Sequence, residues 1–305
     1  VVFADQWRNT ARGLHNPQIA TPNMDRFAEE AFSTDQAVSG CPLCSPYRSK
    51  LLTGRRAVHT GVFGNCMTGY DMCLSPEELC ISQVLKESGY RTGYIGKWHL
   101  DSPELNSGSQ PLSGAEGWDA YTPPGKKRHG FEYWHAYNAW NDHLHMHYWE
   151  EDSEKIFTNL WSPVHETDKA LEFMESRKKE PFALFLSWNP PHPPFEKIPE
   201  KYYDLYRDLE PDYSPNVEGD RFDNQTGEPG VKSRKELDKA QLDAVELRQQ
   251  RPSLPPSGPG NPSGRGQSPF RPTGHRSGPW PHPAGDHWRA SAPWQRQSGC
   301  GLPPD

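Results

Sequence analysis

The chain has 305 residues, enough for one large domain or two ordinary ones, and carries 33 basic against 40 acidic residues, a formal net charge of −7. This balance gives no overall basic field of the kind that binds nucleic acid or an anionic membrane. No apolar run approaches the roughly 20 residues that span a bilayer. Six cysteines in a chain of this length do not make a disulfide scaffold.

Strand and helix patterns alternate over residues 1–247. The patterns predict strands over residues 1–4, 91–95 and 181–188, and helices over residues 21–31, 46–53, 75–88 and 166–179. The first strand is wholly apolar, as expected for a central buried strand. Alternation of this kind predicts an α/β fold with a largely parallel sheet between helices.

Local signals set the predicted helix ends. Thr21-Pro22 provides an N-cap followed by proline at the first helical position, and Met24 and Phe27 begin an apolar stripe that continues to Ala28. Ser75 and Glu78 have the spacing of a capping box, and Gly89 stands where a helix C-terminus favours glycine.

The composition changes after Arg248. Residues 252–305 contain 13 Pro and 9 Gly and no Lys, Glu, Ile, Val, Met or Tyr, so this stretch has too little apolar surface to offset its ordering entropy. We expect residues 248–305 to be a disordered, Arg-rich tail or the product of a shifted reading frame; a nucleic-acid-binding tail is less favoured because lysine is absent. The start at Val1, without Met, is interpreted as a trimmed N-terminus.

Polar residues follow the predicted strands. Asp5 and Gln6 follow the first strand, Lys97 and His99 follow the second, and His192 follows the third. In open α/β sheets, ligands bind outside the carboxyl ends of the strands. We therefore expect these three groups to share one cleft.

Residues 41–54 read CPLCSPYRSKLLTG and place a cysteine at a helix start. Cys44 lies where unpaired amides and the helix dipole favour an anion or a thiolate. Arg48 lies one turn further on, where its guanidinium could bind a tetrahedral oxyanion. The C-x-x-C spacing with Cys41 also allows a redox pair, whereas a zinc site would need a second such pair that the sequence lacks.

Cys44 to Gly54 resembles the C-x-P-x-R…LTG signature of the type I, formylglycine-dependent sulfatases of the alkaline phosphatase superfamily. Residues 89–100 (GYRTGYIGKWHL), 21–26 (TPNMDR) and 191–195 (PHPPF) resemble further motifs of that family, in the family's order. The resemblance covers residues 1–247. It implies the N-terminal portion of a sulfatase catalytic domain with an alkaline-phosphatase-like, mixed and largely parallel sheet, truncated or frameshifted after about residue 247.

The resemblance implies a sulfuric ester hydrolase acting on a sulfate monoester. Its nucleophile would be formylglycine, made from Cys44 by a formylglycine-generating enzyme. Arg48 and Lys97 match the residues that hold the nucleophile and the sulfate oxygens. His99 matches the base that helps to expel sulfate, and His192 the group beside the leaving oxygen.

Asp5, Gln6 and Cys44 match part of the family's divalent metal site, with Ca²⁺ expected first and Mn²⁺ as the alternative. Asp-Gln in place of the commoner Asp-Asp is similar to phosphonate monoester hydrolases, so a phosphonate or phosphodiester hydrolase is the alternative function. The family's second ligand pair and a downstream lysine are missing from residues 200–247, and Asp286-His287 is the nearest candidate pair. A non-catalytic remnant is therefore a further alternative.

Residues 129–149 are rich in histidine and aromatic residues. His143, His145 and His147 alternate, so on a strand they would share one face, either as a polar wall facing the substrate or as a zinc site. We expect this segment to select the substrate, a small-molecule or carbohydrate sulfate ester. Family resemblance also favours export to the periplasm or outside the cell.

Overall fold

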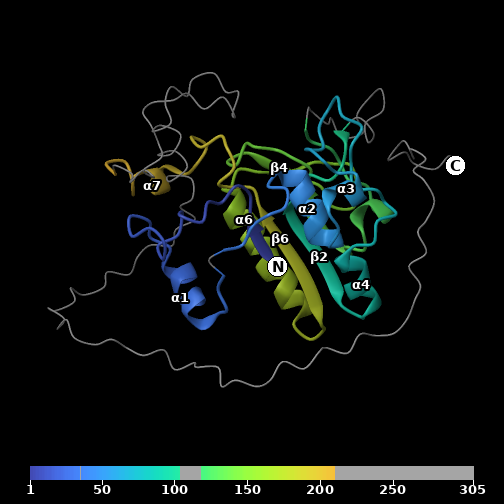
Figure 1. Cartoon of the computed structure of the whole chain (residues 1–305), viewed down its shortest axis with the longest axis horizontal. Helices are drawn as coiled ribbons and strands as arrows, with labels where there is room; N and C mark the ends of the chain where they lie inside the picture. The colour runs from blue at the N-terminus through green and yellow to red at the C-terminus, as the bar shows by residue number, and fades with distance from the viewer. Residues whose placement is uncertain (35, 104–117, 210–305) are drawn as a thin grey trace. The chain divides into compact units, whose positions relative to one another are not determined.

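The computed structural model describes residues 1–34, 36–103 and 118–209 (Figure 1). These residues lie within one compact unit of the chain. The second unit, Arg251–Ser298, lies outside the described residues, as do residues 210–247 of the expected catalytic domain and the whole predicted tail. Among the described residues, no helix combines the length and apolarity needed to cross a bilayer.

Four parallel strands form the central sheet, in the order β1-β6-β2-β3. Their bounds are Val2–Ala4 for β1, Arg91–Lys97 for β2, Tyr133–Tyr137 for β3 and Phe182–Trp188 for β6. The register pairs Ala4 with Trp188, and Gly96 with Ser187. Since all four strands run the same way, their carboxyl ends meet at one edge of the sheet.

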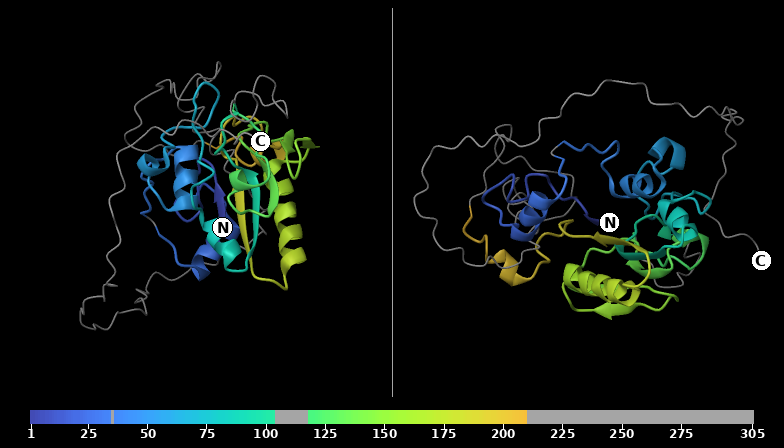
Figure 2. Two further views of the ribbon diagram at one scale, coloured as in Figure 1. Left: turned by 90° about the vertical axis from the view of Figure 1, so that its right-hand side faces the viewer. Right: turned by 90° about the horizontal axis from the view of Figure 1, so that it is seen from below.

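Helices cover both faces of this sheet (Figure 2). Helix α6 (Ser162–Arg177) packs on β2 and β6 from one side, and α4 (Ile81–Glu87) packs on β2 from the other. Helix α2 (Cys44–Thr53) contacts α4 and the short α3 (Ala57–Thr60). The remaining elements are α1 (Pro22–Glu30), η1 (Lys126–Arg128), α7 (Glu200–Tyr203) and the antiparallel pair of β4 (Met146–Tyr148) and β5 (Ile156–Thr158).

Alternation along β2 divides the core between the two faces of the sheet. Tyr94 points to the α4 side, where its ring centroid lies 5.0 Å from that of Trp98 and 5.5 Å from that of Trp134. Ile95 points to the other side, where it packs with Ala170 of α6. The sheet is therefore buried on both faces, as parallel sheets generally are.

The predicted strands and the α/β architecture are confirmed, but three of the predicted helices begin elsewhere. Helix α2 begins at Cys44, two residues before the predicted start. Helix α4 begins at Ile81 instead of residue 75, because the backbone N–H of Cys80 donates to Oε1 of Gln83 at 2.8 Å and forms the capping box there. Glu78, the expected capping partner, instead accepts hydrogen bonds from the guanidinium of Arg55. Helix α6 begins at Ser162, four residues before the predicted start.

Two predictions about burial are wrong. Met24 and Phe27 of α1 are 37% and 70% exposed, because α1 makes no extensive contact with the sheet among the described elements. Strand β1 lies at the edge of the sheet that the described residues form, where it pairs with β6, and Val2 is 61% exposed instead of buried. The N-cap position of Thr21 is confirmed, although its side chain donates to Asp25 and does not cap the helix backbone.

Candidate active site

The carboxyl ends of β1, β6 and β2 bring the predicted site residues together. Asp5 directly follows β1, and its backbone N–H donates to the carbonyl of Trp188 at the end of β6 at 3.0 Å. Lys97 is the last residue of β2, and its Nζ lies 2.7 Å from Oδ2 of Asp5. Because β6 lies between β1 and β2, side chains from all three strand ends converge. The expectation that these groups lie close together is confirmed for Asp5, Lys97 and His192.

Gly96 permits the close approach of β2 to β6 at this edge. Its φ is +94°, and a Cβ built on it would lie 2.2 Å from the carbonyl oxygen of Ser187. No residue with a side chain could occupy that position without moving the backbone. The approach brings Nζ of Lys97 within 3.0 Å of Oδ1 of Asn189, the residue that follows β6.

Helix α2 begins at Cys44, two residues before the predicted start, so Cys44 lies at the helix N-terminus as expected. Its Sγ lies 3.3 and 3.4 Å from the two carboxylate oxygens of Asp5. Burial, followed by the charge of Asp5, raises the pKa of the Cys44 thiol against the opposing effect of Lys97 and Arg48. The expectation of a thiolate is therefore wrong: unmodified Cys44 is a neutral thiol that donates to Asp5. Cys41 and Cys44 are both free cysteines, not a disulfide.

Arg48 lies buried one turn along α2 from Cys44 and is held from two sides. Its Nη1 donates to the carbonyl of Lys97 at 2.5 Å and to Oγ of Ser187 at 2.6 Å, and lies 3.3 Å from the hydroxyl of Tyr94. Its Nη2 donates to Asp5 at 3.3 Å. The planar guanidinium thus bridges α2 to the ends of β1, β2 and β6, which fixes one positive charge behind Cys44.

Asp5 is ionised in spite of its burial. Burial alone raises the pKa of a carboxyl group, but the charges of Lys97 and Arg48 outweigh that effect and hold the pKa of Asp5 well below its usual range. One buried carboxylate therefore faces two buried cations. The three side chains together leave one positive charge, which suits an anionic ligand.

His99 and His192 each present one unprotonated ring nitrogen. Nε2 of His99 lies 3.1 Å from the carbonyl of Cys66, so that nitrogen carries the hydrogen and Nδ1 holds the lone pair. Nδ1 of His192 donates in the same way to the carbonyl of Pro193 at 2.7 Å, which leaves Nε2 as the acceptor. Burial, and then the charge of Lys97, lower the pKa of His99 well below 6.5 and that of His192 to about 3.

Ligand atoms of Asp5, Cys44 and His192 lie within 4.8 Å of one another, so the described residues contain one candidate metal position. Gln6 follows Asp5 with φ +59° and is exposed. Ca²⁺ takes roughly six to eight oxygen ligands. Asp5, Gln6 and an oxygen nucleophile at position 44 would supply part of that shell, and the candidate pair Asp286-His287 lies outside the described residues. The described residues alone therefore do not complete a Ca²⁺ site.

Comparison with known proteins agrees with this geometry. The profile of the family described as Sulfatase matches residues 1–248. The chain belongs to the sulfatase family. The Endo-4-O-sulfatase of Bacteroides thetaiotaomicron is 36% identical over 245 residues, covering 71% of this chain and 48% of that relative. The Ulvan-active sulfatase of Formosa agariphila is 36% identical over 225 residues, covering 71% of this chain and 40% of that relative.

The solved structures confirm the predicted alkaline-phosphatase-like sulfatase fold. The structure of the Bacteroides fragilis protein YidJ, described as a sulfatase, matches with a TM-score of 0.68 and 33% identity, over 80% of this chain and 54% of that chain. The present chain thus spans about half the length of the curated sulfatases it matches, or somewhat less.

The three alternating histidines do not form the predicted common face. His143 and His147 are buried, but Nε2 of His143 lies 2.8 Å from the carbonyl of His192, whereas Nε2 of His147 lies 2.5 Å from Oδ2 of Asp119. His145 is exposed, and its ring lies 3.3 Å from Asp142. Strand β4 begins only at Met146, so the residues before it follow a turn. The zinc alternative is therefore wrong for this sulfatase-family chain.

Three residues that contact the site were not predicted from the sequence. Asn189 binds Lys97, while Ser187 and Tyr94 bind Arg48. Asn189 could have been found, because it follows the predicted strand 181–188 directly and so obeys the rule that selected His192. Ser187 and Tyr94 lie inside strands, where sequence alone does not separate a site contact from ordinary core packing.

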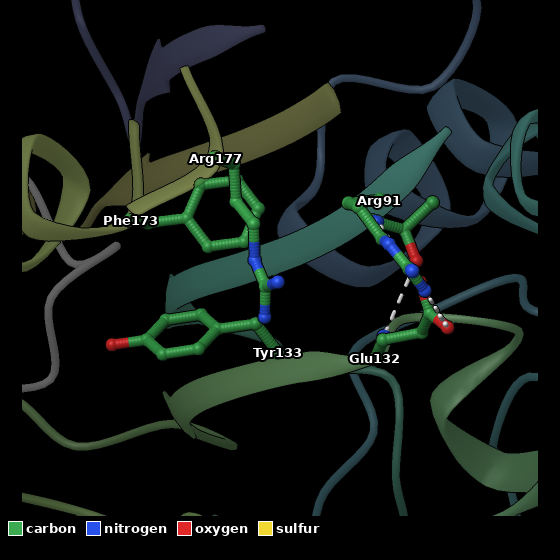
Figure 3. Close-up of a pocket in the computed structure, with 6 residues that line it drawn as sticks. Arg91, Glu132, Tyr133, Phe173 and Arg177 are labelled. Atoms are coloured by element: carbon green, nitrogen blue, oxygen red, sulfur yellow. Dashed lines mark hydrogen bonds and ion pairs between the residues drawn. The ribbon is translucent and has the colours of Figure 1, made fainter. Parts of the chain in front are cut away.

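A pocket of about 140 Å³ lies at the opposite, amino end of the strands (Figure 3). Arg91 begins β2, Tyr133 begins β3, and Arg177 ends α6. Both arginines are paired with Glu180, at 2.7 Å for Arg91 and 3.6 Å for Arg177. Because the charges of both arginines are neutralised, this pocket lacks the excess positive charge that surrounds Asp5.

Proposed function

We propose that the chain carries the nucleophile half of a sulfatase active site that hydrolyses sulfate monoesters. The observation that carries this proposal is the position of Cys44. It begins a helix beside the ionised carboxylate of Asp5, with the buried cations Arg48 and Lys97 around it. Two neutral imidazoles, each with one free nitrogen, complete the group. Positive charge beside a nucleophile position suits attack on an anionic ester.

The protonated thiol supports conversion of Cys44 to formylglycine. A neutral thiol that donates to Asp5 is a weak nucleophile. An aldehyde hydrate at position 44 would supply one hydroxyl that attacks sulfur and displaces the alcohol, and a second hydroxyl that loses its proton and becomes the aldehyde oxygen as the bond between carbon and the sulfated oxygen breaks. The Sγ atom of Cys44 stands in for the attacking hydroxyl oxygen, so Asp5 would accept a hydrogen bond from that hydroxyl.

The surrounding residues have separate tasks in this proposal. Arg48 and Lys97 hold the sulfate oxygens as negative charge collects on them. Nε2 of His192 carries no proton in the neutral ring, so His192 would first take one up from water, which the charge of a bound anionic ester favours because it raises the lowered pKa of His192. Nε2 would then give that proton to the leaving alcohol oxygen. Nδ1 of His99, which has no hydrogen-bond partner among the described residues, takes the proton of the second hydroxyl. Removing one such proton-transfer group typically costs roughly 100- to 10,000-fold in rate.

The substrate class that we propose is a sulfated carbohydrate. The Endo-4-O-sulfatase and the Ulvan-active sulfatase are the relatives that favour it. Trp118 is 40% exposed, and its ring centroid lies 5.7 Å from that of His99, so it offers an aromatic face beside the site. We expect Trp118→Ala to raise KM for a sulfated oligosaccharide and to leave KM for 4-nitrophenyl sulfate nearly unchanged. Maturation by a formylglycine-generating enzyme and export are further parts of the proposal.

The decisive experiment is coexpression with a formylglycine-generating enzyme, followed by mass spectrometry of the peptide that contains Cys44. We expect an aldehyde at this position, together with turnover of 4-nitrophenyl sulfate that Cys44→Ala abolishes. Cys41→Ala is the matched control, because Cys41 lies in the same segment without a part in the proposal. An unmodified thiol under these conditions, or equal turnover by Cys44→Ala, would exclude the mechanism.

The dipeptide Asp5-Gln6 favours one alternative, a phosphonate or phosphodiester hydrolase. It supplies one carboxylate where two would be usual, so the metal would be bound with less negative charge. Faster turnover of an aryl phosphonate monoester than of the aryl sulfate would select this alternative. No turnover of either ester, with no thermal stabilisation by Ca²⁺ or Mn²⁺, would select a non-catalytic remnant.

A further inference from the structure

His143 lies outside the cluster around Cys44 but is bonded to it through the main chain. Its side chain is buried, and its Nε2 lies 2.8 Å from the carbonyl oxygen of His192. A carbonyl oxygen only accepts hydrogen bonds, so Nε2 of His143 carries the hydrogen and donates it. The bond joins the turn before β4 to the loop after β6, across 49 residues of sequence.

The ring of His143 is itself fixed by α6. The backbone carbonyl of His143 accepts from the N–H of Ser162, the first residue of α6, at 3.0 Å. The ring of Trp161 stands at 90° to the ring of His143, with centroids 6.0 Å apart. These contacts hold His143 beside the loop that carries His192, and its donor nitrogen points toward that loop.

The hydrogen bond from His143 completes the restraint of His192. The N–H of His192 donates to the carbonyl of Asn189 at 3.0 Å, and its ring Nδ1 donates to the carbonyl of Pro193. The carbonyl of His192 is the remaining backbone group of that residue, and His143 holds it. With both backbone groups and one ring nitrogen bound, Nε2 is the polar atom of His192 that is left to face a ligand.

We propose that His143 is a positioning residue that aims Nε2 of His192 at the leaving-group oxygen by holding the His192 carbonyl. This inference rests on the proposed function, in which His192 gives a proton to that oxygen. It adds a residue that does not touch the substrate. It also gives the histidine-rich segment a role at the site, although its three alternating histidines do not share one strand face.

Dependence of the rate on the leaving group separates positioning from a general structural role. Proton donation matters most when the leaving alcohol is a poor leaving group, as in an alkyl sulfate, and least for 4-nitrophenyl sulfate. We expect His143→Leu to lower kcat for an alkyl sulfate roughly 10- to 100-fold and kcat for 4-nitrophenyl sulfate less than about 3-fold. His143→Gln keeps an N–H donor and should recover most of the loss. His145→Leu, two residues away and exposed, is the matched control.

Several outcomes overturn the inference. Equal loss on both esters would mean that His143→Leu only lowers the folded fraction, and no loss on either would mean that the hydrogen bond has no effect on the reaction. If the wild-type protein hydrolyses neither ester, the proposed function fails, and a measurement without turnover still decides the positioning. The ¹⁵N resonances of the His192 ring should change between wild type and His143→Leu but not in His145→Leu. An unchanged His192 ring in His143→Leu rejects the inference.

Discussion

Nζ of Lys97 lies 2.7 Å from Oδ2 of Asp5, and the two side chains are 1% and 9% exposed. Each charge is stable in this position because the other is there, since an isolated charge buried in a protein is costly. The pair joins the end of β2 to the end of β1, although the two strands are not neighbours in the sheet. The site and the sheet edge are therefore held by the same contact.

We expect Lys97→Met to lower the free energy of unfolding by roughly 3 kcal/mol, because it leaves the Asp5 carboxylate buried with less compensation. The double variant Lys97→Met/Asp5→Asn should recover part of that loss, since it removes the second charge as well. Urea unfolding of wild type, both single variants and the double variant measures this coupling. Lys197→Met breaks the 3.0 Å pair of Lys197 with Asp142, which is partly exposed, and should cost less than about 1 kcal/mol. Similar losses for Lys97→Met and Lys197→Met would contradict the prediction.

Gly96→Ala should be far more destabilising than Gly89→Ala. Both glycines have positive φ, +94° and +88°, so both variants pay the cost of a left-handed alanine, about 1 kcal/mol. Gly89 has open space around a Cβ, whereas at Gly96 the Cβ would meet the carbonyl of Ser187 at 2.2 Å. We expect Gly96→Ala to lose at least roughly 3 kcal/mol in total, measured by chemical denaturation. Equal Tm values for the two variants would show that β2 and β6 can separate without cost.

Arg48→Lys should lower kcat/KM for a sulfate ester roughly 100-fold, provided that the proposed function holds. An ammonium group cannot reach Ser187, the Lys97 carbonyl and Asp5 at once, as the planar guanidinium does. Arg55→Lys is the control, because Arg55 follows the same helix but pairs on the surface with Glu78. Steady-state kinetics of both variants test this. Retention of wild-type kcat/KM by Arg48→Lys would remove Arg48 from the site.

Acid should destabilise the fold between about pH 6.5 and pH 4. Burial is the largest cause that lowers the pKa of His143 and His165 to about 4 and of His192 to about 3. Because these folded-state values lie below the unfolded value of 6.5, the unfolded chain binds more protons in this range. The stability is thus fully present above pH 6.5 and is lost as the pH falls. Tm measured from pH 7.5 to pH 4.5 should fall, and His165→Gln should make the slope shallower. A Tm that stays constant would contradict this.

Features set by neighbouring residues were predictable from the sequence. A helix that begins within two residues of Cys44 follows from the proline near its start and the glycine after its end, and Gly54 does take the left-handed conformation. The positions of Asp5, Lys97 and His192 follow from the apolar runs that predict strands and the polar residues that come after them. Their convergence follows because the carboxyl ends of parallel strands meet at one edge of the sheet. The fold and most of the candidate site were therefore within reach of sequence reasoning.

Features set by long-range packing were not predictable. The protonation state of Cys44 depends on burial, the charge of Asp5 and the opposing charge of Lys97. The local signal, a helix N-terminus, favours a thiolate, whereas these long-range effects raise the pKa of the thiol. His143 and His147 have the spacing of one strand face, but a turn precedes β4 and sends the two rings to different partners. The exposure of α1 depends on which elements lie against it, which its apolar stripe does not reveal.

The parallel pairing of β1 with β6 has a consequence for the order of events during synthesis. Val2 of β1 pairs with Leu186 of β6, 184 residues further along the chain. A ribosome adding about 5 to 20 residues per second needs roughly 10 to 40 seconds to make that length. Until β6 is made, Asp5 cannot take its place beside Cys44, and the loop that carries His192 does not yet exist. In the proposed function, Cys44 would therefore be open to the maturing enzyme from its own synthesis until the last strand of the described sheet arrives and encloses it.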